Sequence, residues 1–553
     1  MEASSAVAVG ARSAWAPMAH RTYRALWIAQ FTSNVGTWMQ TVGAQWLMGS
    51  LSRDPLKVAL VQTAMSLPIG LFAMPAGAVG DNLDRRRVLL ASQSFMLASA
   101  ALLGALTVAG ETTAWLLLGL TFAIGTGQAL TAPSWQAIQP ELVSRDEIPQ
   151  AATLGGVNMN VARAVGPAIG GALVAAAGPG WVFLLNAASF VAVLAVLARW
   201  RRPETERPLG AEQLTEAMRA GVRYVGGSPR FRAVLVRTTV FAVFASALWA
   251  LLPVVARNHL GMGSGGYGLL LGAIGAGALL GAVILPGFRA RVSVNAIVAV
   301  ASLLFALACA VLAWVRIVPI VVVALVGAGL AWIAVLGSLN GVAQTVLPHW
   351  VRSRGMALYL LTFQGGQAVG AFIWGVVARQ AGTPTALAAV GAGLAAGLAL
   401  VRRFALRSTE GLDVTPSDHW PEPHVVVDPD PGLGPVLVAI EYRVPLENAE
   451  PFREAMRAVG RIRRRTGGQR WSLYQDAADP ERFVETYLTP TWQEHLRQHR
   501  ERVTVTDRTI QERAHAFLAP GTRPRARHLL FAYGDEPLRI LEPPPADEEA
   551  AER

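Results

Sequence analysis

The sequence predicts an all-α membrane protein with twelve transmembrane helices in two six-helix halves, followed by a small α+β ferredoxin-like soluble domain. Hydrophobic residues make up 53% of the 553 residues and charged residues only 15%, with a mean hydropathy of +0.38. A soluble chain of this size carries more charge, so most of it is expected to be surrounded by lipid. Long apolar segments recur up to residue 400, and a soluble composition begins near residue 435.

Each apolar segment has about 17–30 residues, and about 20 are needed for one helix across a hydrocarbon core of about 30 Å. The segments fall into two sets of six, separated by an arginine-rich stretch over 199–232. This count predicts the twelve spans. The first set lies near 26–48, 58–79, 88–108, 115–138, 151–177 and 181–197, and the second near 234–255, 267–285, 294–314, 317–346, 356–377 and 386–400.

Arginines gather in alternate loops. Cytoplasmic loops of membrane proteins carry an excess of Arg and Lys, so the sequence predicts a multi-pass protein of the cell membrane with both termini in the cytoplasm. The net charge of +11 therefore does not indicate nucleic-acid binding, and Lys57 is the sole lysine. The arginine-rich loops hold Arg85–Arg87, Arg145, the 199–232 stretch, Arg289 and Arg291, Arg352 and Arg354, and Arg402 and Arg403.

Composition divides the chain into seven segments. We predict an N-terminal cytoplasmic segment (1–20), an N-terminal six-helix half (21–198), a central cytoplasmic loop (199–232) with an amphipathic helix near 211–225, a C-terminal six-helix half (233–402), a Pro- and Asp-rich linker (403–434), a ferredoxin-like soluble domain (435–533) and a disordered acidic tail (534–553). The soluble domain is expected to follow the order β-α-β-β-α-α-β, which suggests the ferredoxin-like fold.

A short stretch between the second and third spans is the most informative motif. We expect it to form a cytoplasmic loop in which Asp81 pairs with an arginine or faces a helix N-terminus. Asp81, Asp84 and Glu141 all lie at cytoplasmic ends and are interpreted as members of gating pairs. The motif reads Gly77-Ala-Val-Gly-Asp81-Asn-Leu-Asp84-Arg85-Arg86-Arg87.

The fifth span carries a second motif of glycines around a proline. Gly166 and Gly170 form a small-x-x-x-small face for close helix contact, and Pro167 removes a backbone hydrogen bond and so bends the helix. The alternative is generic tight packing. The motif reads Gly166-Pro167-Ala-Ile-Gly170-Gly171.

The first span has a polar stripe whose residues recur at spacings of three and four. One helix face at that spacing can line a water-filled cavity, or it can hydrogen-bond to neighbouring helices. We assign cavity lining to this stripe and to isolated polar residues of other spans. The candidates are Gln30, Asn34, Thr37, Thr41, Gln45, Gln136, Asn158, Asn340, Gln344, Gln364 and Gln367.

Arg163 lies about thirteen residues into the fifth span, deep in the bilayer at about 1.5 Å per residue. A guanidinium there should face protein or water. It can bind an anionic substrate group or satisfy carbonyls that Pro167 frees. No Asp or Glu lies deep in a predicted span, so the sequence offers no evident proton carrier.

The soluble domain offers little chemistry. His495 and His499 have i, i+4 spacing that a metal site can use, but without an evident third ligand we expect a solvated helix face. Four arginines are expected to form a solvated or headgroup-facing patch. Cys309 lies in an apolar run and is interpreted as a packing residue. We predict no catalytic residues, no metal and no cofactor. The arginines are Arg461, Arg463, Arg464 and Arg465.

The first motif resembles the signature loop of the major facilitator superfamily, and the second resembles a motif of drug and proton antiporters. The wording of several segments resembles the transmembrane secretion effector branch, which includes enterobactin-exporter-like proteins. This resemblance implies efflux of drugs, siderophores or other secondary metabolites across a bacterial inner membrane, driven by protons. The segments are Trp38-Met39-Gln40, 132–143, 166–171, 435–444 and 494–499.

The predicted function is therefore a secondary active exporter that works by alternating access. Its partners would be a small-molecule substrate, membrane lipid and protons as coupling ion, with no nucleic acid, and the soluble domain could self-associate. A different reading also stands: a membrane-anchored enzyme, or a substrate sensor, acting through the soluble domain, which resembles antibiotic-biosynthesis monooxygenase folds. Fold alone does not establish that activity.

Overall fold

The structure is a computed structural model of the chain, and it describes residues 13–82, 84–200, 221, 223–289, 291–406, 411–420, 427–531 and 539–540. Two compact units share these residues. The first unit comprises the residues before 210, Val234–Gly341 and Ala357–Leu406; the second comprises the described part of Ala211–Ala233, Val342–Met356 and the residues after Arg407. The predicted central amphipathic helix and the predicted acidic tail fall largely or wholly outside the described residues.

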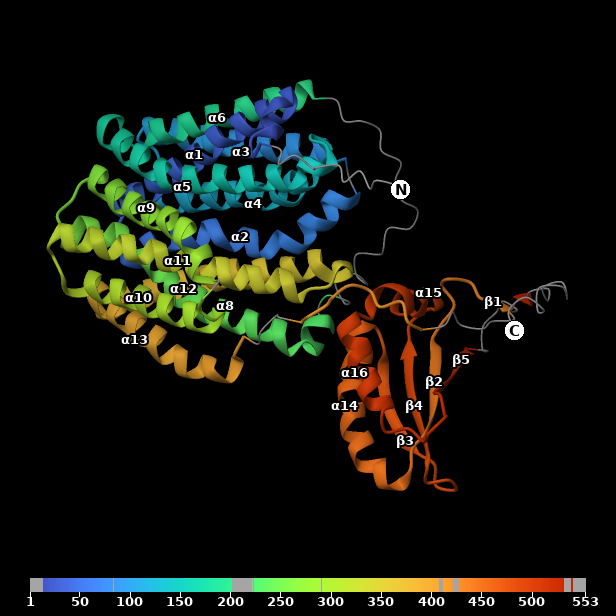
Figure 1. Cartoon of the computed structure of the whole chain (residues 1–553). Coiled ribbons are helices and arrows are strands. Elements are labelled where there is room, and N and C mark those ends of the chain that lie inside the picture. The colour runs from blue at the N-terminus through green and yellow to red at the C-terminus, as the bar shows by residue number, and fades with distance from the viewer. Residues whose placement is uncertain are drawn as a thin grey trace, which may run out of the picture. The chain divides into compact units, whose positions relative to one another are not determined.

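Long helices build the first unit, and Figure 1 shows them running side by side. Ten helices in the described part of the chain are long and apolar enough to cross a membrane. The first set consists of α1 (Arg21–Leu51), α2 (Pro55–Asn82), α3 (Arg85–Val108), α4 (Ala114–Ile138), α5 (Ile148–Ala177) and α6 (Pro179–Arg199). The second set consists of α8 (Pro229–Val254), α9 (Ser264–Arg289), α10 (Val294–Trp314), α11 (Val318–Val346), α12 (His349–Ala381) and α13 (Thr383–Val401).

Capping residues explain where several of these helices begin. Thr113 and Ser293 accept hydrogen bonds from backbone N–H groups in the first turns of α4 and α10. Gly178, at a φ of +85°, separates α5 from α6, a backbone conformation that glycine adopts without strain. The predicted mostly helical membrane protein is confirmed.

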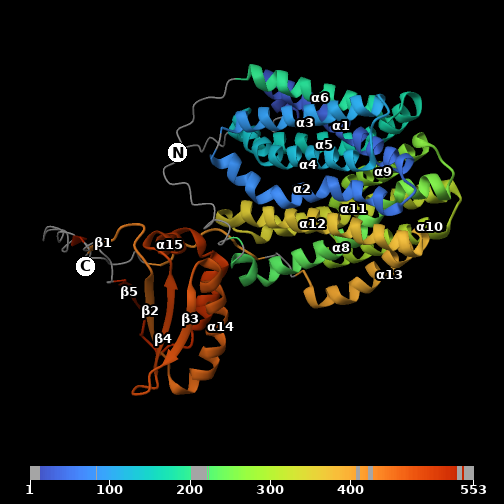
Figure 2. The ribbon, with the colours of Figure 1, turned by 180° about the vertical axis from the view of Figure 1, so that it is seen from behind.

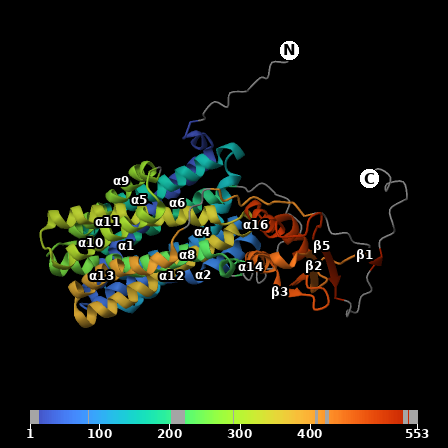
Figure 3. The same ribbon diagram turned by 60° about the horizontal axis from the view of Figure 1, so that its bottom comes forward.

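Within the first set, α1 packs against α5 and α6, α2 packs against α4, and α3 packs against α4 and α6. In the second set, α10 and α13 are neighbours, as Figure 3 also shows. Trp332 of α11 contacts Phe241, Phe305 and Trp249 at ring-centroid distances of 5.8, 6.3 and 5.3 Å. Large aromatic rings therefore fill the centre of the second set.

An antiparallel four-stranded sheet with the strand order β3-β4-β2-β5 forms the core of the second unit. Its elements follow the order β2 (Val436–Arg443), α14 (Ala449–Thr466), β3 (Gln469–Gln475), β4 (Arg482–Thr489), α15 (Trp492–Arg497), α16 (Val505–His515) and β5 (Arg525–Leu530). Two short strands, β1 (Val427–Asp428) and β6 (Arg539–Ile540), pair with each other.

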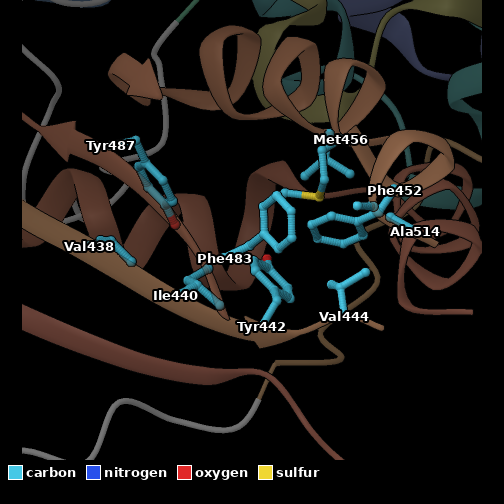
Figure 4. Close-up of a cluster of buried hydrophobic side chains, with 11 residues drawn as sticks. Val438, Ile440, Tyr442, Val444, Phe452, Met456, Phe483, Tyr487 and Ala514 are labelled. Atoms are coloured by element: carbon cyan, nitrogen blue, oxygen red, sulfur yellow. The ribbon is translucent and has the colours of Figure 1, made fainter. Parts of the chain in front are cut away.

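Alternation along the strands explains why one sheet face is covered. Val438, Ile440 and Tyr442 of β2 and Phe483 and Tyr487 of β4 point to the same face and are buried. Phe452, Met456 and Val459 of α14 recur at helical spacing and pack onto them, together with Ala514 of α16. Figure 4 shows this core, and Figure 2 shows α14 beside the sheet.

Candidate functional site

The signature motif is more helical than the sequence predicts. Helix α2 continues to Asn82, so Gly77 and Asp81 belong to its last turns, and Asp84 already caps α3. The side chain of Asp81 lies outside the described residues. Asp84 begins α3, and its carboxylate accepts a hydrogen bond of 2.9 Å from the Arg87 backbone N–H. A negative charge at this position also interacts favourably with the positive end of the helix dipole.

The arginines of this motif tie α3 to other helix ends of the first set. Arg85 forms an ion pair of 2.9 Å with Glu141, which follows α4. Arg86 donates to the carbonyl oxygens of Leu197 and Ala198 at 2.8 Å each, and these are the last carbonyls of α6. All three interactions lie within the first set of helices. Arg86 thus satisfies carbonyl groups that the end of α6 leaves unpaired, whereas Arg85 pairs with a carboxylate.

Glycines of α5 bring this helix into backbone contact with two neighbours. A Cβ on Gly166 would lie 2.6 Å from Trp38 Cβ, and one on Gly170 would lie 2.7 Å from Met39 Cα, both in α1. A Cβ on Gly171 would lie 2.7 Å from Gly268 Cα in α9. Pro167 lies between these contacts inside the helix. The motif therefore faces one helix of its own set and one of the other set.

Polar residues on α1 pair in a chain that reaches α5. Gln30 donates to Asn34 (2.9 Å), Asn34 donates to Asn158 (2.9 Å), and Asn158 donates to the Trp27 carbonyl (2.9 Å). Gln30 Oε1 is buried and has no partner among the described residues. This part of the stripe therefore joins α1 to α5 by hydrogen bonds.

The middle of the stripe lines a small pocket. Thr37 and Thr41 face it from α1, together with Gln128 of α4. Gln40, which the sequence analysis does not single out, also lines it and accepts a hydrogen bond from the buried Asn186 of α6. The pocket is completed by Ala44, Met65, Thr121, Ile124 and Gly125. Its volume is about 10 Å³, roughly the space of one water molecule, so the stripe does not line an open cavity in this conformation.

Arg163 lies against the ring of Trp38. Its guanidinium carbon is 5.4 Å from the ring centroid, a distance at which a cation is attracted to an aromatic face. Its Nε is buried and has no hydrogen-bond partner among the described residues. The predicted contact with carbonyls freed by Pro167 is not among the described interactions.

The last member of the stripe, Gln45, contacts the second set. Its Nε2 donates to the Trp249 carbonyl of α8 at 3.2 Å, and its Oε1 accepts a hydrogen bond from the Tyr267 hydroxyl of α9. Nearby, Arg257 donates to Ser50 Oγ at 2.9 Å and lies 4.2 Å from the Trp46 ring centroid. Tyr267 is a single polar residue in an apolar run, so its spacing gave no sequence signal.

Helices α2 and α12 supply a second line of contact between the sets. Gln62 donates to Gln367 at 3.3 Å, and Thr63 donates to the Ala368 carbonyl at 3.0 Å. Of the remaining predicted cavity residues, Gln136 and Gln344 are exposed near the ends of α4 and α11, and Asn340 and Gln364 are half-buried.

Two predictions about the soluble domain are wrong. His495 and His499 do not lie on a solvated face: their side chains are 1% and 8% exposed. His495 contacts the ring of His528 at 4.6 Å and that of His499 at 5.7 Å, and neither of its ring nitrogens has a partner among the residues that the structure describes. No group of three or more His, Cys, Asp or Glu within the described ranges is arranged to hold a metal ion. Burial of α15 against β5 explains the difference.

The arginine patch is also partly buried. Arg463 forms an ion pair of 2.9 Å with Glu485, with both side chains inside the domain, and Glu485 also accepts hydrogen bonds from Tyr442 and Trp471 at 2.7 and 2.8 Å. Arg465 pairs with Asp507 of α16. These arginines therefore stabilise the domain interior, because a buried carboxylate needs such partners.

Helices in two sets, joined through α5 and α9 and through α2 and α12, with paired arginines at the signature motif, define a membrane transporter of the major facilitator type. The family model "transmembrane secretion effector" matches residues 12–534. The chain belongs to this family, and the resemblance predicted from its motifs is confirmed.

Individual relatives are more distant. The chain is 28% identical over 379 residues to the enterobactin exporter EntS of Citrobacter koseri, which covers 67% of this chain and 88% of that protein. It is 27% identical over 379 residues to the enterobactin exporter EntS of Salmonella typhimurium, covering 67% and 89%.

Solved structures share the fold. A POT family transporter in complex with 5-aminolevulinic acid has a TM-score of 0.58 at 14% identity, covering 69% of this chain and 96% of that chain. A bacterial homolog of the human lysosomal transporter Spinster, in an inward-facing and occupied conformation, has a TM-score of 0.56 at 17% identity, covering 70% and 98%.

Proposed function

We propose that this protein is a secondary active exporter of small secondary metabolites, siderophores foremost, that works by alternating access and is coupled to protons. It would cross the inner membrane twelve times: α1 and α13 would add two spans to the ten helices that are long and apolar enough to cross a membrane. Both termini would lie in the cytoplasm. The family supports transport, and the curated relatives named as enterobactin exporters support the substrate class. The structural neighbours reported above are transporters, so a membrane-anchored enzyme or sensor is not favoured.

One observation carries the proposal. The contacts between the two sets run from the end of the bundle that holds the α1–α2 and α8–α9 connections to the middle of the helices, where Gly275 approaches Ala164 and Gly70 approaches Gly365. They include Gln45 with Tyr267, Arg257 with Ser50, and Asp54 with Arg379 at 3.9 Å. With cytoplasmic termini, the end that holds these connections is the outer end of the bundle. The conformation would then be closed to the outside, as an exporter is when it receives a substrate from the cytoplasm.

The first set supports binding of a polar or anionic substrate. Thr37, Gln40 and Thr41 line a pocket of about 10 Å³ that would have to widen to admit a substrate. Arg163 lies beside an aromatic ring, and its buried Nε has no hydrogen-bond partner among the described residues. A buried cation of this kind is worth most when it meets an anionic group in a site of low dielectric constant. Arg163 would therefore provide the anion contact.

Transport by reconstituted protein tests this function. Full-length protein in liposomes that contain the iron-free siderophore should release it when a proton gradient is imposed, and Arg163→Gln should slow release at least tenfold, which corresponds to about 1.4 kcal/mol. Arg379→Gln removes an exposed arginine with a 3.9 Å contact and should have a smaller effect. Release that is unchanged by the gradient would refute proton coupling, and unchanged release by Arg163→Gln would refute the anion contact.

We also propose that the C-terminal domain has the ferredoxin-like fold and self-associates through its outer sheet face. The strand order β3-β4-β2-β5 supports the fold. Leu437, Leu488 and Leu529 form one cross-strand row on the face opposite the helices, and Leu529 is 51% exposed.

Cross-linking of membranes tests self-association. The wild-type protein should give a dimer, and Leu529→Glu should reduce it severalfold, whereas Leu446→Glu, at an exposed leucine outside the sheet, should not. An unchanged dimer in Leu529→Glu would refute this interface.

A further inference from the structure

The second unit contains a groove that the transport function does not use. Its walls come from three stretches of the chain: the first turn of α8, the segment that follows α13, and α16. The groove has a volume of about 290 Å³, at the lower edge of the range for small-molecule sites. The lining residues are Arg230, Gly411, Asp413, Val505, Thr506, Thr509, Ile510 and Arg513.

Buried contacts hold the α8 wall beside α16. Arg465 of α14 is ion-paired with Asp507 in the first turn of α16. The same arginine packs on Gly227, where an added Cβ would lie 2.6 Å from Arg465 Cβ. Gly227 precedes Arg230 by three residues. Tyr224, just upstream, donates to the Val346 carbonyl at 3.1 Å and meets the Trp350 ring edge-on. The position of Arg230 relative to α16 is therefore fixed by packing.

Hydrogen bonds to the backbone of the segment after α13 hold this third wall against α16. The Thr506 hydroxyl accepts from the Asp413 N–H at 2.9 Å and donates to the Asp413 carbonyl at 2.8 Å. The Val505 N–H donates to the Thr415 carbonyl at 3.0 Å. The groove is thus built from three segments with defined relative positions, as a binding site requires.

The charges inside the groove are not balanced. Arg230 Nε is buried and lacks a partner within the described ranges, and Arg513 contributes a second guanidinium from α16. The one carboxylate, Asp413, is occupied: it accepts from the Thr415 N–H at 2.9 Å and from the Thr415 hydroxyl at 2.5 Å. Those hydrogen bonds, the hydroxyl first, hold the pKa of Asp413 below its ordinary value. Two arginines therefore face a groove whose acid is already satisfied.

We propose that this groove binds an anionic group, a phosphate or a phosphodiester, between the guanidinium groups of Arg230 and Arg513. Arginine presents several N–H donors in a planar fork that matches phosphate oxygens. Ile510 and Val505 supply apolar walls beside the charged pair. Bound there, the anion would contact both the first turn of α8 and α16. Binding would therefore change the contacts of a helix that continues into the first unit. The phosphate can belong to an acidic lipid headgroup or to a soluble anion.

Ligand-dependent stabilisation of the full-length protein tests this site. The protein is placed in nanodiscs of phosphatidylcholine alone and titrated with inorganic phosphate, and separately in nanodiscs that also contain phosphatidylglycerol. The thermal unfolding midpoint should rise in at least one arm, which identifies the source of the phosphate. Arg230→Gln/Arg513→Gln should weaken the response about tenfold or more, since each removes a charge-assisted contact.

Two controls keep the result unambiguous. Arg508→Gln removes another arginine of α16, one that is paired with Glu512 at 2.7 Å and does not line the groove, and it should respond like the wild type. Gly227→Ala should weaken the response by displacing Arg465, whereas Gly226→Ala, where a Cβ meets nothing within 4 Å, should not. Absence of stabilisation in both arms, or an equal response from the double variant and Arg508→Gln, overturns the proposal. If the double variant does not fold, the exposed Arg513→Gln alone serves the comparison.

Discussion

At the scale of single residues, the most unusual group is the imidazole of His495. It is 1% exposed, and neither ring nitrogen has a partner in the described part of the domain. Burial is the main cause that lowers the pKa of His495 to about 3 and that of His499 to about 4, with His528 as a nearby positive charge when protonated. Both histidines are therefore neutral in the folded domain at neutral pH.

A pH dependence of stability follows. An unfolded histidine binds its proton near pH ~6.5, whereas the folded ones bind it only near their lowered pKa values. As pH falls below ~6.5, the unfolded chain gains protons that the folded domain does not, so stability falls. We expect a loss of about 1 kcal/mol per histidine between pH 6.5 and 5.5, measured by chemical denaturation of the full-length protein.

Replacing the imidazole separates this effect from general acid sensitivity. His495→Phe should flatten the pH dependence and stabilise the domain at neutral pH, because an unpartnered buried polar group costs about 1–3 kcal/mol. His349→Phe, at an exposed position, should leave the pH slope unchanged. A slope that stays the same in His495→Phe would contradict the assignment.

The residue scale is also where sequence reasoning was weakest. The i, i+4 spacing of His495 and His499 is the same on a solvated face and on a buried one. What decides between them is His528, more than twenty-five residues later in the chain, which reaches the cluster through β5. Arg463 was likewise placed on the surface because its partner, Glu485, lies on a strand whose pairing the sequence does not specify. Long-range partners set burial, and local pattern does not contain them.

At the scale of elements, α5 depends on glycines that allow two neighbours to approach at once. Gly171→Ala should separate α5 from α9, because the new Cβ would lie 2.7 Å from Gly268 Cα and from the Ser264 carbonyl, and backbone atoms cannot move aside singly. We expect a destabilisation of about 1–3 kcal/mol and slower transport. Thermal unfolding in detergent and the liposome assay measure the two effects.

The same helix provides the control. Gly156→Ala adds a Cβ where nothing lies within 4 Å, so it should keep wild-type stability or improve it slightly through helix propensity. Equal effects of the two substitutions would mean that the α5–α9 contact does not limit stability.

Elements were the level that sequence patterns predicted best. Period-two alternation gave β2, and the spacing of Phe452, Met456 and Val459 gave α14. The error fell at the signature motif, where glycines and an aspartate indicated a loop but the helix continues to Asn82. In a membrane protein such glycines can lie inside a helix, where they allow close packing. They therefore mark the end of a helix less reliably than in soluble domains.

At the scale of the whole molecule, the proposed mechanism requires the closed end of the first unit to open. Cysteines at positions 50 and 257, in a Cys309→Ala background, should be joined by a bifunctional methanethiosulfonate reagent, which forms a disulfide with each thiol and spans the space that the longer arginine fills, because Ser50 Oγ and an Arg257 guanidinium nitrogen lie 2.9 Å apart across the two helix sets. The cross-link should reduce the rate of export at least tenfold, and reduction of the cross-link should restore export. Each single-cysteine variant, treated in the same way, is the control. Full export by the linked protein would contradict alternating access at this end.

The assembly of helices was only partly predictable. Hydropathy indicates spans because lipid satisfies no backbone polar group, which leaves little choice but helix. It does not indicate which helices of the two sets meet. Gln45 belonged to a stripe whose other members face α5 or the pocket, yet its own partners, Trp249 and Tyr267, lie in α8 and α9.

Trp350 has a practical consequence for anyone who shortens this chain. Its indole lies between Tyr224 and the guanidinium of Arg502, which is 4.8 Å from the ring centroid. Cutting the polypeptide after α13 removes Arg502 and bares an aromatic pair together with the surface around Gly227. Such a truncated protein would tend to aggregate in detergent, and its failure to export would then report on solubility and not on regulation.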